Sequence, residues 1–517
     1  MIIHTRIKYS ILIIIITSIF FSSPAIFANL KSVEECKQEV RKNPDNALAH
    51  YNLGDAYFKS GKYQKAIESY KQVIRIVPDF AKAHIFIGLA YLALDMSKEA
   101  IKSFKKAISI DPDSKEAHHN LGAVYSGSGK HQEAIESFKQ AIRIDPDDAV
   151  VHYGLGLAYY YSGKYEEAIE PHKQATRINP DYAEAHFHLG ITYYNTGKYQ
   201  KAIESFKQAI RIDPDFPDAH NNLGIVYSGS GKHQEAIESF KQAIRINPDH
   251  AGYHYSLGLA YVESGKYEEA IEPYKQAIKI DPDYAEAHCS LGYTYYGLGR
   301  YKEATESCKQ AIRIDPDFAG AHYNLGLVYY DLGKYKEAIE SYKQAIRIEP
   351  DYAAVHFNLG LVYLDLKVMN SAFEEYKILE KLDTEWANKL FNMILDTEVI
   401  DPDDADVQYN LGIAYRKTGR NEEEVESYKQ AIRIDPDLAI AHYNLGVAYG
   451  NLGKYKKAKE SFKQAIRIDP DYKSAHYNLG ITYLQINDRG SAIEQYKILK
   501  KLDTEMANKL FNLINSE

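Results

Sequence analysis

The sequence is short of the residues on which many functions depend. It has three cysteines in 517 residues, Cys36, Cys289 and Cys308. They show neither the even count of a disulfide framework nor the paired short spacing of a zinc site, so we expect no redox or metal role from them. No long block of Lys or Arg occurs, and the net charge of −9 is modest for this length. The electrostatic footprint of a nucleic-acid-binding protein is therefore missing.

Long apolar runs are also absent, except at the start of the chain. Two basic residues precede an apolar run over residues 11–21, and small residues follow as far as Ala28. This layout predicts a secretory signal peptide over residues 1–28, with cleavage after Ala25 or Ala28. An uncleaved membrane anchor fits the same stretch, because a membrane helix needs ~20 residues. In either case we expect an exported protein, in the periplasm, cell envelope or extracellular space, with membrane contact only through this segment.

What the sequence does have is one unit repeated. After each of a series of glycines a Tyr follows at the third position, and in nearly every unit an Ala follows at the twelfth and a Pro at the twenty-fourth, as in Tyr57, Ala66 and Pro78. Such self-similarity indicates a repeat architecture. The glycines recur at one constant spacing, which widens only between Gly360 and Gly412. They are Gly54, Gly88, Gly122, Gly156, Gly190, Gly224, Gly258, Gly292, Gly326, Gly360, Gly412, Gly446 and Gly480.

Each unit reads as two helices. In the first unit Leu53 and Tyr57 share one helical face, Gly61 interrupts the pattern, and Ala66 and Tyr70 begin the apolar stripe of a second helix. The Pro at the end stops that helix because it has no N–H and clashes with the preceding turn. We expect the Asp after the Pro to cap the next helix, as in the capping boxes Asp181/Glu184 and Asp283/Glu286.

The pattern of small residue, aromatic, Ala, aromatic and Pro resembles the tetratricopeptide repeat family over roughly residues 32–517, with a repeat of about 34 residues. The resemblance implies an all-α fold, a right-handed α-solenoid of tandem helix-turn-helix repeats, because one helix pair cannot bury its own apolar face. It also implies that ligands lie along a concave groove lined by the first helices. The basic clamp by which some members hold a C-terminal carboxylate is disfavoured, because the matching places carry Tyr51 and Asp55.

Two features that suggest metal sites have simpler interpretations. A His stands four residues before most of the glycines, from His50 to His476, where the family places a bulky packing residue. The Asp-Pro-Asp tracts combine a helix stop with a cap and lack the clustered ligands that calcium requires. No Ser, His and Asp arrangement falls outside the repeat pattern. We therefore expect no metal, no cofactor and no catalytic residue.

Two sets of first-helix residues are candidates for partner binding. Asn amides both donate and accept, so a row of them can pair with the backbone of an extended peptide; alternatively each Asn bonds to the adjacent repeat. Exposed aromatics with polar tips are typical interface anchors. The row comprises Asn52, Asn120, Asn222, Asn324, Asn358, Asn410, Asn444 and Asn478, and the aromatic lining comprises Tyr153, Tyr160, Tyr161, Phe187, Tyr194, Tyr255, Tyr293, Tyr296, Tyr323 and Tyr330.

The segment at the end of the sequence also occurs once in its interior. Residues 376–394 and 496–514 have nearly the same sequence, and in both copies Thr replaces the Pro and a further amphipathic segment follows. Such a segment fits a capping helix that covers the last apolar layer of a solenoid. The unit after the first copy also carries Glu424 in place of the buried Ala, where an unpaired carboxylate is costly. We therefore predict a first array over residues 29–395 and a second over residues 396–517.

These observations favour an exported, non-enzymatic scaffold that holds protein or extended peptide partners, in envelope assembly or secretion. The alternative is a substrate-recruiting subunit of a glycosyltransferase or protease system, whose catalytic domain would lie on another chain. The sequence does not identify the partner or the oligomeric state.

Overall fold

The computed structural model describes residues 32–396 and 403–516, in which every regular element is a helix. The predicted signal segment lies outside these residues. Within the described ranges, no helix combines the length and apolar character needed to cross a membrane. The chain divides into two compact units, Met1–Asp281 and Pro282–Glu517, which we treat as separate bodies.

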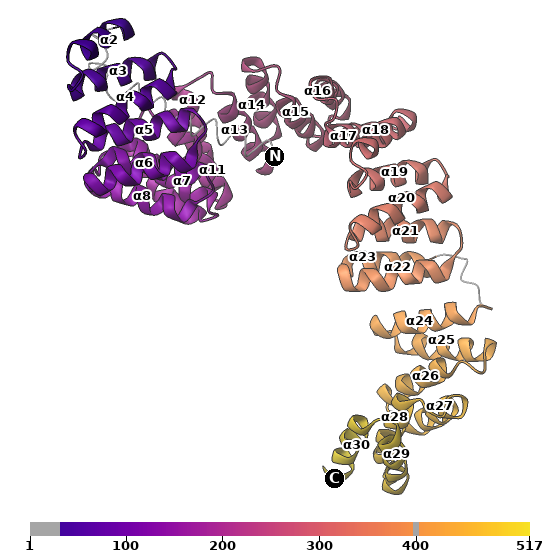
Figure 1. Ribbon diagram of the computed structural model, residues 1–517. Coiled ribbons are helices and arrows are strands. Elements are labelled where there is room, and N and C mark those ends of the chain that lie inside the picture. The colour runs from indigo at the N-terminus through magenta and orange to yellow at the C-terminus, as the bar shows by residue number, and fades with distance from the viewer. Residues whose placement is uncertain (1–31, 397–402, 517) are drawn as a thin grey trace. The chain divides into compact units, whose positions relative to one another are not determined.

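In the first unit a short helix is followed by helix pairs, and we call the members of each pair the first and second helix of a repeat. The helices are α2 (Val33–Lys42), α3 (Ala47–Lys59), α4 (Tyr63–Ile76), α5 (Ala81–Ala93), α6 (Ser97–Ile110), α7 (Lys115–Gly127), α8 (His131–Ile144), α9 (Ala149–Tyr161), α10 (Tyr165–Ile178), α11 (Ala183–Asn195), α12 (Tyr199–Ile212), α13 (Pro217–Gly229), α14 (His233–Ile246), α15 (Ala251–Glu263) and α16 (Tyr267–Ile280). Figure 1 shows them as successive pairs, so the predicted solenoid of helix-turn-helix repeats is confirmed.

The second unit continues the same alternation and adds the two capping helices. Its helices are α17 (Ala285–Gly297), α18 (Tyr301–Ile314), α19 (Ala319–Asp331), α20 (Tyr335–Ile348), α21 (Ala353–Asp365), α22 (Met369–Leu382), α23 (Thr384–Asp396), α24 (Ala405–Lys417), α25 (Asn421–Ile434), α26 (Ala439–Asn451), α27 (Tyr455–Ile468), α28 (Lys473–Gln485), α29 (Arg489–Leu502) and α30 (Thr504–Ser516). The array boundary predicted near residue 396 lies inside this unit.

The repeat glycine lets the two helices of a unit come into close contact. A Cβ atom at Gly54 would lie 2.6 Å from the ring of Tyr70, which is fully buried. Any side chain at Gly54 would therefore push the helices apart. A second glycine makes the turn between them, because Gly61 has φ of 71°, a conformation that favours glycine.

The turn between repeats differs from our prediction. Asp181 does not cap α11; the N-cap residue is Tyr182, with no capping side chain, and the Asp181 N–H instead donates to Asn179 Oδ1 at 3.1 Å. The predicted capping box at α17 is wrong in the same way, because its N-cap residue is Tyr284. The side chain of the residue before the Pro, Asn179, forms a turn by accepting the N–H of Asp181. Asp181 therefore belongs to that turn, and α11 has its N-cap one residue later than the sequence suggests. Where the N-cap residue is itself short and polar, as at Asp148, its side chain does cap.

The repeated His is part of this turn. In eleven repeats its Nε2 lies 2.8–3.2 Å from the carbonyl oxygen of the Pro six residues earlier. A carbonyl only accepts, so Nε2 carries the proton and donates. The histidines are His50, His118, His152, His186, His220, His254, His288, His322, His356, His442 and His476. Each ties the first helix of its repeat to the turn that leads into it.

Both predicted capping segments are helices, α23 and α30. Leu390 and Ile394 of α23 are fully buried, and Leu510 of α30 is buried likewise. A Cβ atom at Gly360 would lie 2.6 Å from the Leu390 side chain, which therefore takes the place that an aromatic ring fills in an ordinary repeat. The apolar layer of the last repeat before each cap is thus covered from within the chain.

Candidate partner-binding face

The first helices of neighbouring repeats contact one another. In the first unit α5 contacts α7, and the series continues through α9, α11 and α13 to α15; in the second unit α17 contacts α19, α19 contacts α21, and α26 contacts α28. We call the surface that these helices share the first-helix face. It comprises the residues two and three positions before, and one, four and five positions after, each repeat glycine. All of the predicted partner-binding residues belong to it.

Four asparagines of the predicted row bridge to the preceding repeat. The acceptor is the side chain 35 residues earlier, which is a Tyr hydroxyl in three cases and a thiol in the fourth. The contacts are Asn324 Nδ2 to Cys289 Sγ at 3.2 Å, Asn358 Nδ2 to the Tyr323 hydroxyl at 3.2 Å, Asn444 Nδ2 to the Tyr409 hydroxyl at 3.2 Å, and Asn478 Nδ2 to the Tyr443 hydroxyl at 3.0 Å.

The other asparagines of the row have different surroundings. Asn120 and Asn222 each donate to a carbonyl oxygen of their own helix at 2.8 Å. Asn410 is buried, and its Oδ1 has no hydrogen-bond partner in the described part of the chain; Asn52 is half-buried. Six of the eight amides thus use an N–H inside the chain. In half-buried Asn222, Asn324 and Asn358 the oxygen is the atom left for a ligand, and the peptide-binding role of the row stays a prediction.

The predicted aromatic lining separates into buried and exposed members. Tyr153 and Phe187 are only 2% and 8% exposed, and the Tyr153 hydroxyl lies 3.0 Å from His188 Nδ1. These two side chains therefore pack within and between repeats in the described structure. Tyr194 and Tyr293 are 40% and 39% exposed. The half-buried members are Tyr160, Tyr161, Tyr255, Tyr296, Tyr323 and Tyr330.

Acidic side chains accompany the tyrosines of the second unit, and the sequence analysis did not single them out. The Tyr330 hydroxyl donates to Asp365 Oδ2 at 2.7 Å. Burial, together with this hydrogen bond, raises the pKa of Tyr330 well above its ordinary value, and burial likewise raises that of Tyr296, beside Asp331. Each Asp stands 35 residues after its Tyr. That spacing places them on neighbouring first helices, and it is the signal that could have identified the pairs.

Glu424 and its neighbours form a second polar group that involves α24 and α25. Glu424 is 1% exposed, and neither its Oε1 nor the hydroxyl of buried Tyr428 has a hydrogen-bond partner among the described residues. Burial raises the pKa of Glu424, while the charge of nearby Arg416 acts in the opposite direction. The Arg416 guanidinium donates to Asn444 Oδ1 at 3.1 Å. The cost expected from the sequence at Glu424 is therefore present in the structure.

Comparison with known protein families gives several matches. A profile described as the C-terminal domain of cilia and flagella-associated protein 70 matches residues 113–322. Three profiles of the tetratricopeptide repeat match residues 54–95, 326–367 and 414–453, residues 81–114 and 439–472, and residues 35–68 and 307–340. The chain belongs to the tetratricopeptide repeat family.

Solved tetratricopeptide structures and related proteins resemble parts of the chain. YrrB, described as a tetratricopeptide protein with an unusual peptide-binding site, is 24% identical over 39% of this chain and 99% of its own, with a TM-score of 0.34. MamA is 33% identical over 31% of this chain and 95% of its own, with a TM-score of 0.31. The C-terminal part of a Cytophaga hutchinsonii tetratricopeptide protein is 18% identical over 47% and 99%, with a TM-score of 0.40. TM-scores this low carry no argument about function. No curated protein matches the chain.

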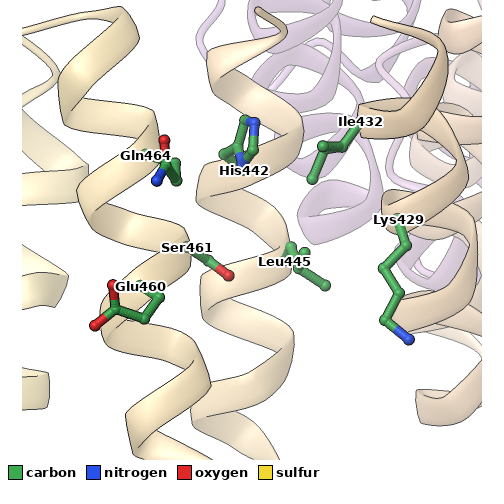
Figure 2. A pocket seen from close by; sticks show the side chains of 7 residues that line it. All are labelled: Lys429, Ile432, His442, Leu445, Glu460, Ser461 and Gln464. Atoms are coloured by element: carbon green, nitrogen blue, oxygen red, sulfur yellow. The ribbon is translucent and has the colours of Figure 1, made fainter. Parts of the chain in front are cut away.

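A hollow of about 260 Å³ lies among three helices of the tetratricopeptide repeats in the second unit (Figure 2). His442 lines it, but Nε2 of that ring hydrogen-bonds the Pro436 carbonyl oxygen at 3.0 Å. The Lys429 amine pairs with Glu426 at 3.1 Å, and Figure 2 shows it pointing away from His442. The lining is that of a crevice between repeats. Its residues are Lys429, Ile432, His442, Leu445, Glu460, Ser461 and Gln464.

Proposed function

We propose that the chain is a non-enzymatic scaffold that binds an extended segment of a protein partner along the first-helix face. The tetratricopeptide fold is compatible with a protein-binding role. Side-chain amides and tyrosines of this face bind the backbone of the partner peptide. The side chains of the peptide therefore contribute little to the affinity.

The observation that carries this proposal is the combination of exposed tyrosine rings and half-buried amides on the first helices. The rings of Tyr194 and Tyr293 are 40% and 39% exposed and offer apolar area. Asn222, Asn324 and Asn358 are half-buried, and each uses its Nδ2 inside the chain. Their Oδ1 atoms are left to accept a backbone N–H of an extended peptide.

The test is a selection of random 12-residue peptides that bind the full chain, followed by chemical changes to the peptides selected. If the backbone is what is bound, single alanine substitutions in a peptide should change its affinity little, whereas N-methylation of one or two backbone amides should weaken it about tenfold or more. Tyr293→Ala should weaken binding as well. Tyr199→Ala is the matched control, since Tyr199 is 51% exposed but lies at the start of a second helix. Tolerance of N-methylation would refute the proposal.

We also propose that this scaffold works outside the cytoplasm, in envelope assembly or secretion. The support is the sequence of residues 1–28, with its basic start, apolar run and small residues near Ala28. The non-enzymatic assignment is supported by the repeat pattern, which accounts for the described residues from 32 onward without a second fold.

A further inference from the structure

The two capping helices, α23 and α30, pack in the same way on the repeat before them. They differ in how exposed their opposite face is. Phe391 of the first copy is 1% exposed, whereas the equivalent Phe511 is 45% exposed. Phe373 is likewise 1% exposed, and its equivalent Ile493 is 38% exposed. The same holds for two further positions on the helix before each cap, where buried Met369 and Tyr376 correspond to exposed Arg489 and half-buried Tyr496.

Helix α24 contributes to covering the first copy. Its residues Val407, Leu411 and Ala414 are at most 3% exposed and belong to the same apolar cluster as Phe373 and Phe391. The Tyr415 ring meets Phe391 edge-on, with centroids 6.1 Å apart. The Lys417 amine forms an ion pair with Glu380. The chain therefore shows what this surface binds: an amphipathic helix with aliphatic or Ala residues at positions i, i+4 and i+7.

The second copy presents the same surface uncovered. We call it the second cap face and define it by Arg489, Ile493, Tyr496, Lys500 and Phe511. The rings of Tyr496 and Phe511 lie 5.2 Å apart at 35°, almost as Tyr376 and Phe391 do at 5.5 Å and 32°. The face is therefore preformed, and a ligand helix would not have to order it.

We propose that the second cap face is a docking site for an amphipathic helix of another protein. The helix packs its aliphatic stripe on Ile493, Tyr496 and Phe511, as α24 packs on the first copy. This site is separate from the first-helix face and does not depend on the function proposed for that face.

Charge specifies the chemistry of the docked helix. Glu380 of the first copy pairs with Lys417 at the end of α24, but the equivalent residue of the second copy is Lys500, and Met369 corresponds to Arg489. Cations thus flank the second cap face on both sides of its apolar centre. The docked helix should carry Asp or Glu near both ends, since opposite charges across an interface select the partner.

A second copy of this chain is the less suitable occupant. Its first described helix, α2, ends with Arg41 and Lys42, and α3 ends with Lys59. Placed as α24 is placed on the first copy, either helix would bring a cation to Lys500. Like charges at an interface disfavour that pairing.

The test uses the full chain and a fluorescent peptide with the sequence of residues 403–419, stapled between positions 409 and 413, away from the cap-facing residues. Two forms are compared, one with Lys at position 417 and one with Lys417→Glu. Fluorescence anisotropy should show the Glu form binding several-fold more tightly. Lys500→Glu in the chain should reverse that preference.

Variants of the chain identify the surface that binds. Ile493→Glu and Phe511→Glu should each weaken binding about tenfold or more. Ile440→Glu, at a residue 40% exposed on α26, should leave it unchanged. All three sites are exposed, so circular dichroism should show unchanged melting. Absence of binding by both peptides, equal binding by both, or binding that survives Phe511→Glu would each overturn the proposal. So would a dimer of the full chain that Phe511→Glu dissociates, because the occupant would then be a second copy.

Discussion

His356 Nδ1 lies 2.6 Å from Glu375 Oε2, where α21 packs against α22, and both side chains are almost fully buried. In the second copy of the same segment His476 Nδ1 lies 2.7 Å from Gln495 Oε1. Both rings also bond the turn through Nε2. The two copies therefore contain the same contact, once with a carboxylate and once with a neutral amide.

This difference predicts a pH dependence that is confined to the first copy. Burial acts to lower the pKa of His356, but the hydrogen bonds to Glu375 and to the Pro350 carbonyl outweigh it, so its pKa is raised above the ordinary value of 6.5. Because the pKa is raised, the His356–Glu375 pair contributes its full stabilisation of the folded state below pH 6.5. That contribution is lost as the pH rises through the pKa of His356 in the folded state.

The measurement is denaturant unfolding followed by the fluorescence of Trp386, which lies in α23. Glu375→Gln should lower the free energy of unfolding by on the order of 1 kcal/mol at pH 6, because a neutral hydrogen bond replaces a charge-assisted one. The loss of stability caused by this substitution should be smaller at pH 9. Gln495→Glu is the matched gain-of-charge variant and should introduce the same dependence around α28 and α29. A constant difference between pH 6 and pH 9 would contradict the assignment.

Glu424→Ala should stabilise the second unit by about 1–3 kcal/mol, because it removes a buried carboxylate oxygen that has no partner among the described residues. Burial raises the pKa of Glu424. An acid with a raised pKa favours the folded state most below its ordinary pKa and least once it ionises, so the gain should be larger at pH 8 than at pH 4. Urea melts followed by circular dichroism measure it. Ala458→Glu, at the same place one repeat later, is the converse control and should destabilise.

The position of the embedded cap predicts two units of folding. Limited proteolysis should cut first near residues 396–404, and a fragment of residues 401–517 should fold alone as a helical domain. The two units should not be independent, because deleting residues 401–517 would expose the apolar cluster that joins Phe391 to Val407 and Leu411. The unfolding midpoint reported by Trp386 fluorescence should therefore fall by several degrees on that deletion. An unchanged midpoint would show that the two arrays unfold independently.

Export is predicted from residues 1–28 alone. Deleting them should leave the protein in the cytoplasm, and N-terminal sequencing of the exported form should begin near Asn29. The purified deletion variant should keep its helical content, because the repeats begin later in the chain. A mature chain that still begins at Met1 and stays in the membrane fraction would show an anchor instead.

Backbone-level features were accessible from the sequence, whereas side-chain partners were not. Gly54 and the equivalent glycines reveal the repeat spacing because only glycine fits against the ring of the second helix. This requirement is visible in the sequence as a glycine at the same position of every repeat. The hydrogen bond of Asn358 to Tyr323 depends on how two helices from different repeats align. The burial of Tyr153 depends on its neighbours in the same way. The cap at Asp181 was mispredicted because two acceptors flank the same Pro and the sequence does not rank them.

The bond that eleven of the repeated histidines make to the carbonyl of the Pro six residues earlier has a consequence for how such a gene can change. Both partners of the joint, as in His288 and Pro282, lie within one short stretch of chain. A duplicated or deleted block of whole repeats therefore contains both partners of each such hydrogen bond. The repeats on either side of the block need no change in sequence to keep theirs. Recombination between near-identical repeats can lengthen or shorten the array one whole repeat at a time without disturbing the connections that remain.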